Sequence, residues 1–186
     1  MRTITAKIEG TAPYSPSRYH NAEKLKKESH ADYDLRTWRE HCTYDEKGVV
    51  AIPAMAIKMS LDSAAFKLKE RVPGKGTKEW SGYFVSGVIS AAQHYSLGVH
   101  KDEVDFIDIW ANADGKRGSG KRVMRRYPII TNWKATIALD VIDESIPAEL
   151  VEKYLTETGN LIGVGRFRPE KGGFNGRFAV KTVKWS

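Results

Sequence analysis

The sequence predicts an α+β protein of the ferredoxin-like or RRM-like kind, in which an antiparallel sheet carries two helices on one face. Three patterns lead to this prediction. Short segments alternate between apolar and polar residues, as half-buried strands do. Two longer segments repeat their apolar residues at helical spacing. The order of these segments is close to β-α-β-β-α-β, so we expect both helices to cover the same face of one sheet.

The first strand and the first helix have the clearest patterns. In residues 2–11, apolar side chains at positions 4, 6 and 8 alternate with polar ones, which predicts a strand with one buried face. Residues 49–52 form a short apolar strand, and Pro53 then suits the first turn of a helix. The apolar stripe of this helix consists of Ile57, Leu61, Ala64, Ala65 and Leu68.

The segments between these elements are more polar. Residues 17–47 carry scattered aromatic residues and predict an excursion over the surface, with a short helix at residues 22–28. Strands are expected over residues 83–91 and 104–110, and a turn-rich basic segment should follow over residues 112–126.

The C-terminal third repeats the pattern of strand and helix. Residues 133–142 predict a strand, Pro147 opens a second helix, and Phe178 lies in a last strand. The apolar face of this helix consists of Leu150, Val151, Tyr154, Leu155, Leu161 and Ile162. We interpret residues 1–186 as a single RRM-like domain with insertions at about 13–48 and 112–128.

Composition limits the class of protein. The chain has 186 residues, enough for a core without covalent staples, and a formal net charge of +7. The single cysteine, Cys42, excludes an intramolecular disulfide and a cysteine-rich zinc site. With no signal-like segment and no apolar run that could span a membrane, we expect a cytoplasmic protein without a membrane partner. The positive charge suggests a polyanionic partner, although a protein can be basic without one.

One concentration of positive charge lies between Asp114 and Tyr127, where glycines interrupt a run of basic residues. Like charges this close repel by on the order of 1 kcal/mol per neighbouring pair in water. A polyanion would neutralise them, which favours nucleic-acid contact over a merely solvated loop. The basic residues are Lys116, Arg117, Lys121, Arg122, Arg125 and Arg126.

The same segment also resembles a nucleotide-binding motif. Residues 115–121 fit G-x-x-x-x-G-K, the phosphate loop of nucleotide hydrolases. Arg122 stands where that loop needs Ser or Thr to hold magnesium. We therefore do not expect nucleotide hydrolysis.

A second concentration of charge, residues 163–178, joins the second helix to the last strand. Glycines let backbone amides approach a phosphate, arginines offer forked donors, and phenylalanines can stack on bases. The alternative is a helix end and a turn whose phenylalanines fill the core. The candidate nucleic-acid-binding residues here are Gly163, Gly165, Arg166, Phe167, Arg168, Lys171, Phe174 and Arg177.

Patterns for catalysis or metal binding are weak. The five histidines form no known metal-binding motif. Asp32, Asp34 and His41 could perform acid–base chemistry or bind a metal, but surface residues with no such role are more common. We expect no catalytic residues, no metal and no cofactor.

Two blocks of the chain resemble the RAMP superfamily, the RNA-binding subunits of multi-subunit CRISPR effector complexes. Residues 50–61, Val-Ala-Ile-Pro-Ala-Met-Ala-Ile-Lys-Met-Ser-Leu, resemble its signature of a strand, Ile-Pro, small residues, a lysine and a helix. The second block is the strand over residues 135–143, the helix from Pro147, and the glycine-rich stretch 163–178. A glycine-rich loop at this place is the hallmark of the superfamily, and the subgroup most similar to this chain is the backbone subunits.

The resemblance implies an RRM-like fold, repeated phosphate contacts and head-to-tail assembly, and it places Lys58 near the nucleic-acid backbone. The expected function is non-catalytic binding of single-stranded RNA or DNA. The expected partners are that nucleic acid, further copies in a homo-oligomer or filament, and other CRISPR-type subunits. A free-standing phage or mobile-element relative would have the same layout. Two alternatives stay open: a ribonuclease that uses a histidine or aspartate from residues 20–41, and a mobile-element protein that imitates or inhibits a CRISPR subunit.

Overall fold

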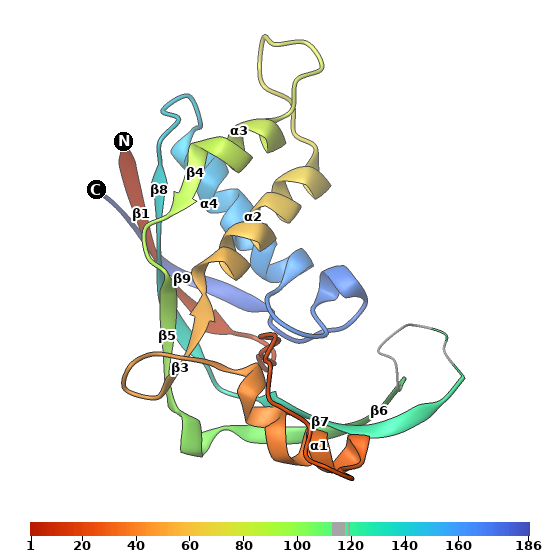
Figure 1. Cartoon of the computed structure of the whole chain (residues 1–186). Coiled ribbons are helices and arrows are strands. Elements are labelled where there is room, and N and C mark those ends of the chain that lie inside the picture. The colour runs from red at the N-terminus through yellow and green to blue at the C-terminus, as the bar shows by residue number, and fades with distance from the viewer. Residues whose placement is uncertain (113–117, 119) are drawn as a thin grey trace.

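A four-stranded antiparallel sheet forms the centre of the protein (Figure 1). The structure is a computed structural model, and it describes residues 1–112, 118 and 120–186. The order of the strands across the sheet is β4-β8-β1-β9. Their bounds are β1 (Arg2–Gly10), β4 (Val88–Ser90), β8 (Lys134–Val141) and β9 (Phe178–Trp185).

Two helices connect these strands on one face of the sheet (Figure 1). Helix α2 (Ala54–Leu68) lies in the chain between β1 and β4, and α4 (Ala148–Glu157) lies between β8 and β9. In the sheet, β8 separates β1 from β4, and β1 separates β8 from β9. Two split βαβ units therefore interleave, which is the predicted ferredoxin-like arrangement.

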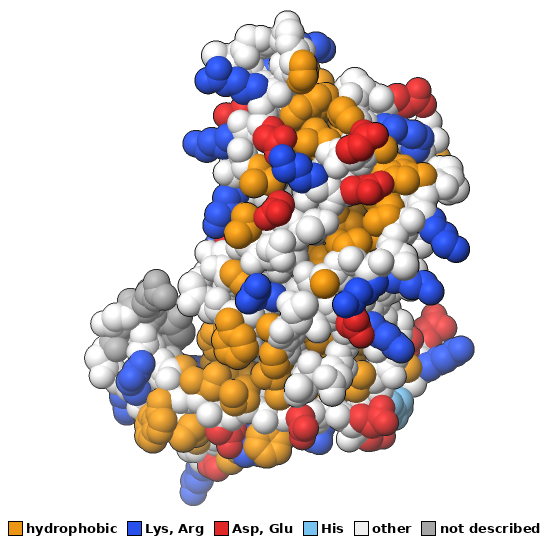
Figure 2. All heavy atoms as spheres, turned by 180° about the vertical axis from the view of Figure 1, so that it is seen from behind, with side chains coloured by type: hydrophobic (Ala, Val, Ile, Leu, Met, Phe, Trp, Pro, Cys, Tyr) orange, Lys and Arg blue, Asp and Glu red, His pale blue; other side chains and the backbone are white. Residues whose placement is uncertain are grey.

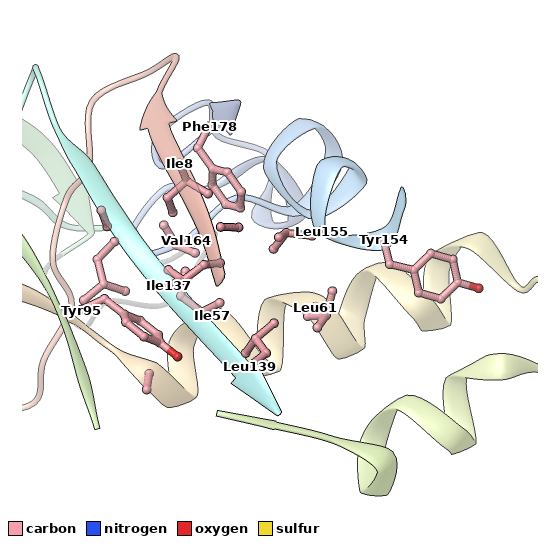
Figure 3. Close-up of a cluster of buried hydrophobic side chains, with 14 of the residues drawn as sticks. Ile8, Ile57, Leu61, Tyr95, Ile137, Leu139, Tyr154, Leu155, Val164 and Phe178 are labelled. Atoms are coloured by element: carbon pink, nitrogen blue, oxygen red, sulfur yellow. The ribbon is translucent and has the colours of Figure 1, made fainter. Parts of the chain in front are cut away.

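The core lies between the sheet and these helices (Figure 3). Ile8 and Ile137 project from the sheet toward Ile57 and Leu61 of α2 and Leu155 of α4, and all five are at most 1% exposed. Full burial of an aliphatic side chain of this size contributes about 1.5–3 kcal/mol. The apolar residues of the alternating and helical sequence patterns are therefore the ones that pack between the sheet and the helices.

Further strands and helix α1 form a second part below the sheet (Figure 1). Strands β2, β3 and β5 make a three-stranded sheet, and β6 and β7 make a separate antiparallel pair. The bounds are α1 (His30–Thr37), β2 (Thr43–Tyr44), β3 (Val49–Pro53), β5 (His94–His100), β6 (Asp105–Asn112) and β7 (Arg122–Ile129). Short turns of helix are η1 (Trp38–His41), η2 (Lys101–Glu103), the π-helical η3 (Thr158–Ile162) and η4 (Pro169–Lys171). None of the described helices is both long and apolar enough to cross a membrane.

The helix predicted at residues 22–28 was wrong, because the helix of this segment is α1. Ser29 caps it: its hydroxyl oxygen accepts the Asp32 backbone N–H at 3.1 Å. The spacing of Ser29 and Asp32 is an N-terminal helix signature, so this helix start was readable from the sequence.

The strand predicted over residues 83–91 was also wrong for most of its length. Helix α3 (Trp80–Gly87) occupies this region, and only the short β4 follows. Phe84 is fully buried and its ring lies 4.6 Å from that of Tyr154 on α4, centroid to centroid. Packing against the other helices thus overrides the strand preference of the aromatic and β-branched residues in this segment. Strand β5 was not predicted.

The turn-rich basic segment expected over residues 112–126 ends in a strand. Residues Arg122–Ile129 form β7, and each of them pairs with a residue of β6. Arg122, Arg125 and Arg126 are therefore strand residues, with side chains that alternate between the two faces of the pair. Lys116 and Arg117 lie outside the described residues.

Leu161, expected on the apolar face of the second helix, is 37% exposed. Leu161 lies within the π-helical turn η3, which follows α4. A π turn adds one residue per turn and rotates the following side chains away from the helical stripe. The next residue, Ile162, is 1% exposed and belongs to the core side.

Candidate nucleic-acid-binding groove

The glycine-rich loop, residues 163–177, folds back onto the body of the protein. A Cβ atom at Gly176 would lie 1.8 Å from the carbonyl oxygen of Val164, and one at Gly165 would lie 2.5 Å from that of Ser15. Both glycines also have positive φ, at 69° and 78°. These glycines therefore serve close backbone packing and left-handed geometry.

Backbone amides of the loop are largely used inside the protein. The Arg166 N–H donates to the Ser15 carbonyl at 2.7 Å, and the Gly176 N–H donates to the Pro13 carbonyl at 2.7 Å. The Val164 N–H donates to the Gly176 carbonyl at 3.0 Å. Our interpretation that the glycines expose amides to a phosphate does not hold at these three positions, so a ligand of this loop would meet its side chains.

The segment of residues 13–16 holds the loop against strand β7. The backbone of Tyr14 exchanges two hydrogen bonds of 2.9 Å with Ile130. The Ser15 hydroxyl donates to the Pro128 carbonyl at 2.9 Å, while the Ser15 carbonyl accepts from Arg166. The two basic regions that the sequence identified are joined through this segment.

Arg166 makes the direct contact between the two regions. Its guanidinium carbon lies 4.4 Å from the centroid of the Tyr127 ring on β7, and the Phe167 ring lies edge-on to the same ring at 5.5 Å. Burial, together with the charge of Arg125, lowers the pKa of Arg166, with burial as the larger cause. Within the described part of the chain, the buried Nε of Arg166 has no hydrogen-bond partner. A desolvated guanidinium with an unmet donor suits an anionic oxygen.

The arginines of β7 are held by carboxylates of the protein. Arg126 makes two hydrogen bonds, of 2.8 and 2.7 Å, to Asp108 on β6, which lower the pKa of that carboxyl. Arg125 lies 3.6 Å from the Asp34 carboxylate of α1. Lys121 and Arg122 are exposed. Of the β7 arginines predicted to contact nucleic acid, Arg122 is thus more accessible to a ligand than Arg126.

Some charged side chains of the glycine-rich loop are likewise paired with a carboxylate, while another is exposed. Arg168 contacts Glu170 through two hydrogen bonds, of 3.0 and 2.6 Å, and Lys171 lies 3.5 Å from the same carboxylate. Arg177 is exposed, and so is Phe174, at 63%. These two side chains are open to solvent at the surface of the loop.

Lys58 is buried, and its ammonium group is paired inside the protein. Its ammonium group donates to the Phe84 carbonyl at 3.0 Å and forms an ion pair with Asp62 one turn along α2. The residue is 5% exposed. The structure therefore gives no support to the contact with a nucleic-acid backbone that the family resemblance implied for Lys58.

A groove of about 210 Å³ lies where the two sequence blocks meet. Ser60 of α2 donates its hydroxyl to the Gly163 carbonyl at 2.9 Å, which fixes the helix against the loop. The groove combines cationic side chains with apolar ones, and it includes residues that the sequence analysis missed. Its lining includes Arg18, His41, Met59, Ser60, Gly165 and Arg168.

Two histidines lie beside this groove. The rings of His20 and His41 meet edge-on at 4.7 Å, and the ring of His41 lies 6.3 Å from that of Tyr127. The His41 Nδ1 atom is 3.0 Å from the Arg18 carbonyl. Burial lowers the pKa of His41, and the nearby charge of Arg166 acts in the same direction. Among the described residues, no group of three His, Cys, Asp or Glu side chains could hold a metal ion.

Comparison with known proteins finds a similar fold among solved structures. No protein-family model and no curated protein sequence matches the chain. Among solved structures, it is similar to a chain in "Cryo-EM structure of the Type III-B Cmr-beta bound to cognate target RNA", at 14% sequence identity and a TM-score of 0.57. The match covers 99% of this chain and 60% of that chain, so this protein spans less than two thirds of the length of its neighbour.

A second match is the crystal structure of Cmr6 from Pyrococcus furiosus, at 14% identity and a TM-score of 0.48, over 96% of this chain and 98% of that one. The resemblance to CRISPR-complex subunits that two sequence blocks suggested is confirmed as a likeness of fold to the Type III-B Cmr-beta chain.

Proposed function

We propose that this protein binds single-stranded RNA in the groove between the glycine-rich loop and the start of α2, as a subunit of a CRISPR-type RNA–protein assembly. The groove itself is the main support. It places the cationic side chains of Arg18 and Arg168 beside the apolar side chain of Met59. Single-stranded nucleic acid is held in this way, with positive charge along the backbone and apolar surface against the bases.

The surroundings of the groove extend the basic surface. Arg166 follows Gly165, which lines the groove, and contacts Tyr127 of β7, while Arg177 and Arg122 are exposed. The fold neighbour was determined with target RNA, which favours RNA over DNA as the ligand. We therefore assign the backbone contacts to Arg18, Arg166, Arg168 and Arg177.

Assembly along the strand is part of the proposal. Helix α2 presents Met55 and Phe66 on one exposed stripe, at 62% and 53% exposure. The β6–β7 pair presents Phe106 and Trp110, at 46% and 59%. Figure 2 shows hydrophobic side chains gathered over the lower part of the molecule, where Figure 1 places this pair. Two unlike apolar surfaces are what a head-to-tail contact between copies requires.

The test is a titration of labelled RNA and of DNA of the same sequence at several salt concentrations. If four arginines each neutralise one phosphate, log Kd should rise with log salt with a slope of about 3. The double change Arg166→Glu/Arg177→Glu should abolish binding. Lys7→Glu/Lys134→Glu changes the charge equally on the open face of the sheet and should leave most of the affinity.

Three outcomes would contradict the proposal. They are a salt-independent affinity, equal losses in both double variants, or DNA bound more tightly than RNA. Sizing the protein on RNA of increasing length tests assembly separately, because a head-to-tail array should add copies as the strand lengthens.

A further inference from the structure

A second groove, of about 460 Å³, lies between strands β5 and β8. The two strands run close to each other (Figure 1) but do not pair, because β5 belongs to the three-stranded sheet. Strand β4 pairs with β8 from Leu139 to Val141, so the other half of β8 has no neighbouring strand on this side in the described part of the chain. This groove shares no lining residue with the one assigned to RNA.

The free half of β8 turns backbone groups toward this groove. The Ala138 carbonyl accepts the Ala91 N–H at 3.0 Å, so the backbone of Ala138 points away from β1. Backbone groups alternate in direction along a strand, so the N–H and C=O groups of Thr136 and Lys134 point the same way as those of Ala138. Among the described residues, no backbone group pairs with them on this side. Half of β8 is thus an open strand edge.

Strand β5 forms the opposite wall. The Gln93 carbonyl accepts the Ala54 N–H at the end of β3, at 2.9 Å. By the same alternation, the backbone of Ser96 points away from β3, and Ser96 lines the groove. The Tyr95 hydroxyl donates to the Ala138 carbonyl at 2.5 Å and closes one end. A Cβ atom at Gly98 would have no atom within 4 Å, so the groove is open there.

The floor of the groove is apolar. Ile8, Leu97 and Ala135 line it, and they are 1%, 3% and 6% exposed. Successive side chains of a strand point to opposite faces. A strand placed beside β8 would therefore direct every second side chain toward this floor, where an apolar residue fits.

The rim of the groove is positively charged. Lys7 and Lys134 line it and are exposed. Glu9, the partner of Lys134 in the β1–β8 pair, lies 3.3 Å from Lys181 of β9 and is engaged there. The side chains of an added strand that alternate with the apolar ones would face these lysines, which favours acidic residues at those positions.

We propose that this groove binds an extended segment of a partner protein, in which apolar residues alternate with acidic ones, as a strand added to the free edge of β8. Strand addition of this kind takes its affinity from main-chain hydrogen bonds and its specificity from alternate side chains. The same edge of a second copy carries the same lysines and would be repelled. The inference is independent of RNA binding.

The test is an anisotropy titration of the whole protein with a labelled octapeptide of alternating glutamate and valine. We expect binding, with slower amide hydrogen exchange at Lys134 and Thr136 when the peptide is present. The same peptide N-methylated at every residue cannot donate to the strand edge, and it should bind at least about tenfold more weakly. A peptide of alternating lysine and valine should not bind.

Two double variants with equal changes of charge separate this inference from the proposed function. Lys7→Glu/Lys134→Glu should weaken peptide binding about tenfold or more and leave RNA affinity in place. Arg166→Glu/Arg177→Glu should lose RNA and keep the peptide.

Several results would overturn the inference and leave RNA binding untouched. They are no peptide binding at millimolar concentration, equal binding of the N-methylated or the lysine peptide, and an unchanged peptide affinity in Lys7→Glu/Lys134→Glu. Displacement of the peptide by RNA would also overturn it, because the groove would then belong to the nucleic-acid site. Peptide binding without RNA binding would contradict the proposed function alone.

Discussion

Arg166 and Lys58 should respond to substitution in opposite ways, although the sequence assigned both to the ligand. Arg166→Met keeps an apolar side chain against Tyr127 and removes the guanidinium. A hydrogen bond to a charged group contributes about 1.5–3 kcal/mol, so RNA affinity should fall about ten- to a hundredfold. The slope of log Kd against log salt should also fall by about 0.7, the value for one lost single-strand phosphate contact.

The free energy of unfolding should hardly change in Arg166→Met. The lost cation–π contact costs about 0.5–2 kcal/mol, and removal of a desolvated charge offsets part of that cost. Lys58→Met should instead lower the free energy of unfolding and leave RNA binding unchanged. It leaves Asp62 and the Phe84 carbonyl without their partner, which should cost about 1.5–3 kcal/mol of stability without altering affinity or salt slope.

Chemical denaturation and anisotropy on the same two variants provide the assay. The double variant should show the sum of both effects, since the two sites share no partner. If Lys58→Met reduced the salt slope while Arg166→Met left it unchanged, the assignment of the groove would be refuted.

Three further predictions concern the loop, the pH dependence and the helix start. Gly176→Ala should destabilise the fold by more than about 1 kcal/mol, because its Cβ would lie 1.8 Å from the Val164 carbonyl, whereas Gly82→Ala in α3 has open space and should be neutral or stabilising in denaturant titrations. Because the pKa of His41 is lowered in the folded protein, the unfolded chain binds more protons below its ordinary pKa of about 6.5. The stability should therefore fall as the pH falls through this range, and His41→Gln should weaken that dependence; an unchanged slope of stability against pH would contradict the buried environment. Ser29→Ala removes the cap of α1 and should cost about 1 kcal/mol, measured as a lower denaturation midpoint, with Ser186→Ala at the C-terminus as a control that should show no change.

The sequence predicted the parts of the fold that depend on local pattern. Strand β1 and helix α2 each bury one regular face, so the spacing of apolar residues in the sequence matches the buried positions in the structure. In α3 the buried residues Trp80, Phe84 and Gly87 do follow helical spacing. The neighbouring aromatic and β-branched residues suggested a strand there, and contacts with distant helices decided the outcome.

The candidate site, too, could be predicted from the sequence only in part. The glycine-rich loop was located correctly as a segment, but the roles of its residues depend on partners far away in the sequence. Arg166 meets Tyr127, and Ser60 meets Gly163. No local signal distinguished Lys58, which is buried, from Arg18, which lines the groove. Pairings of this kind arise only when the chain is folded.

The segment of residues 13–16 has a consequence for binding energy. Because it hydrogen-bonds to both the glycine-rich loop and strand β7, the two surfaces that would face RNA keep a fixed distance before any ligand arrives. A preformed receptor loses little conformational entropy on association. The ordering cost then falls on the flexible strand alone, so a short RNA that spans both surfaces should gain more affinity from added length than from a preferred base sequence.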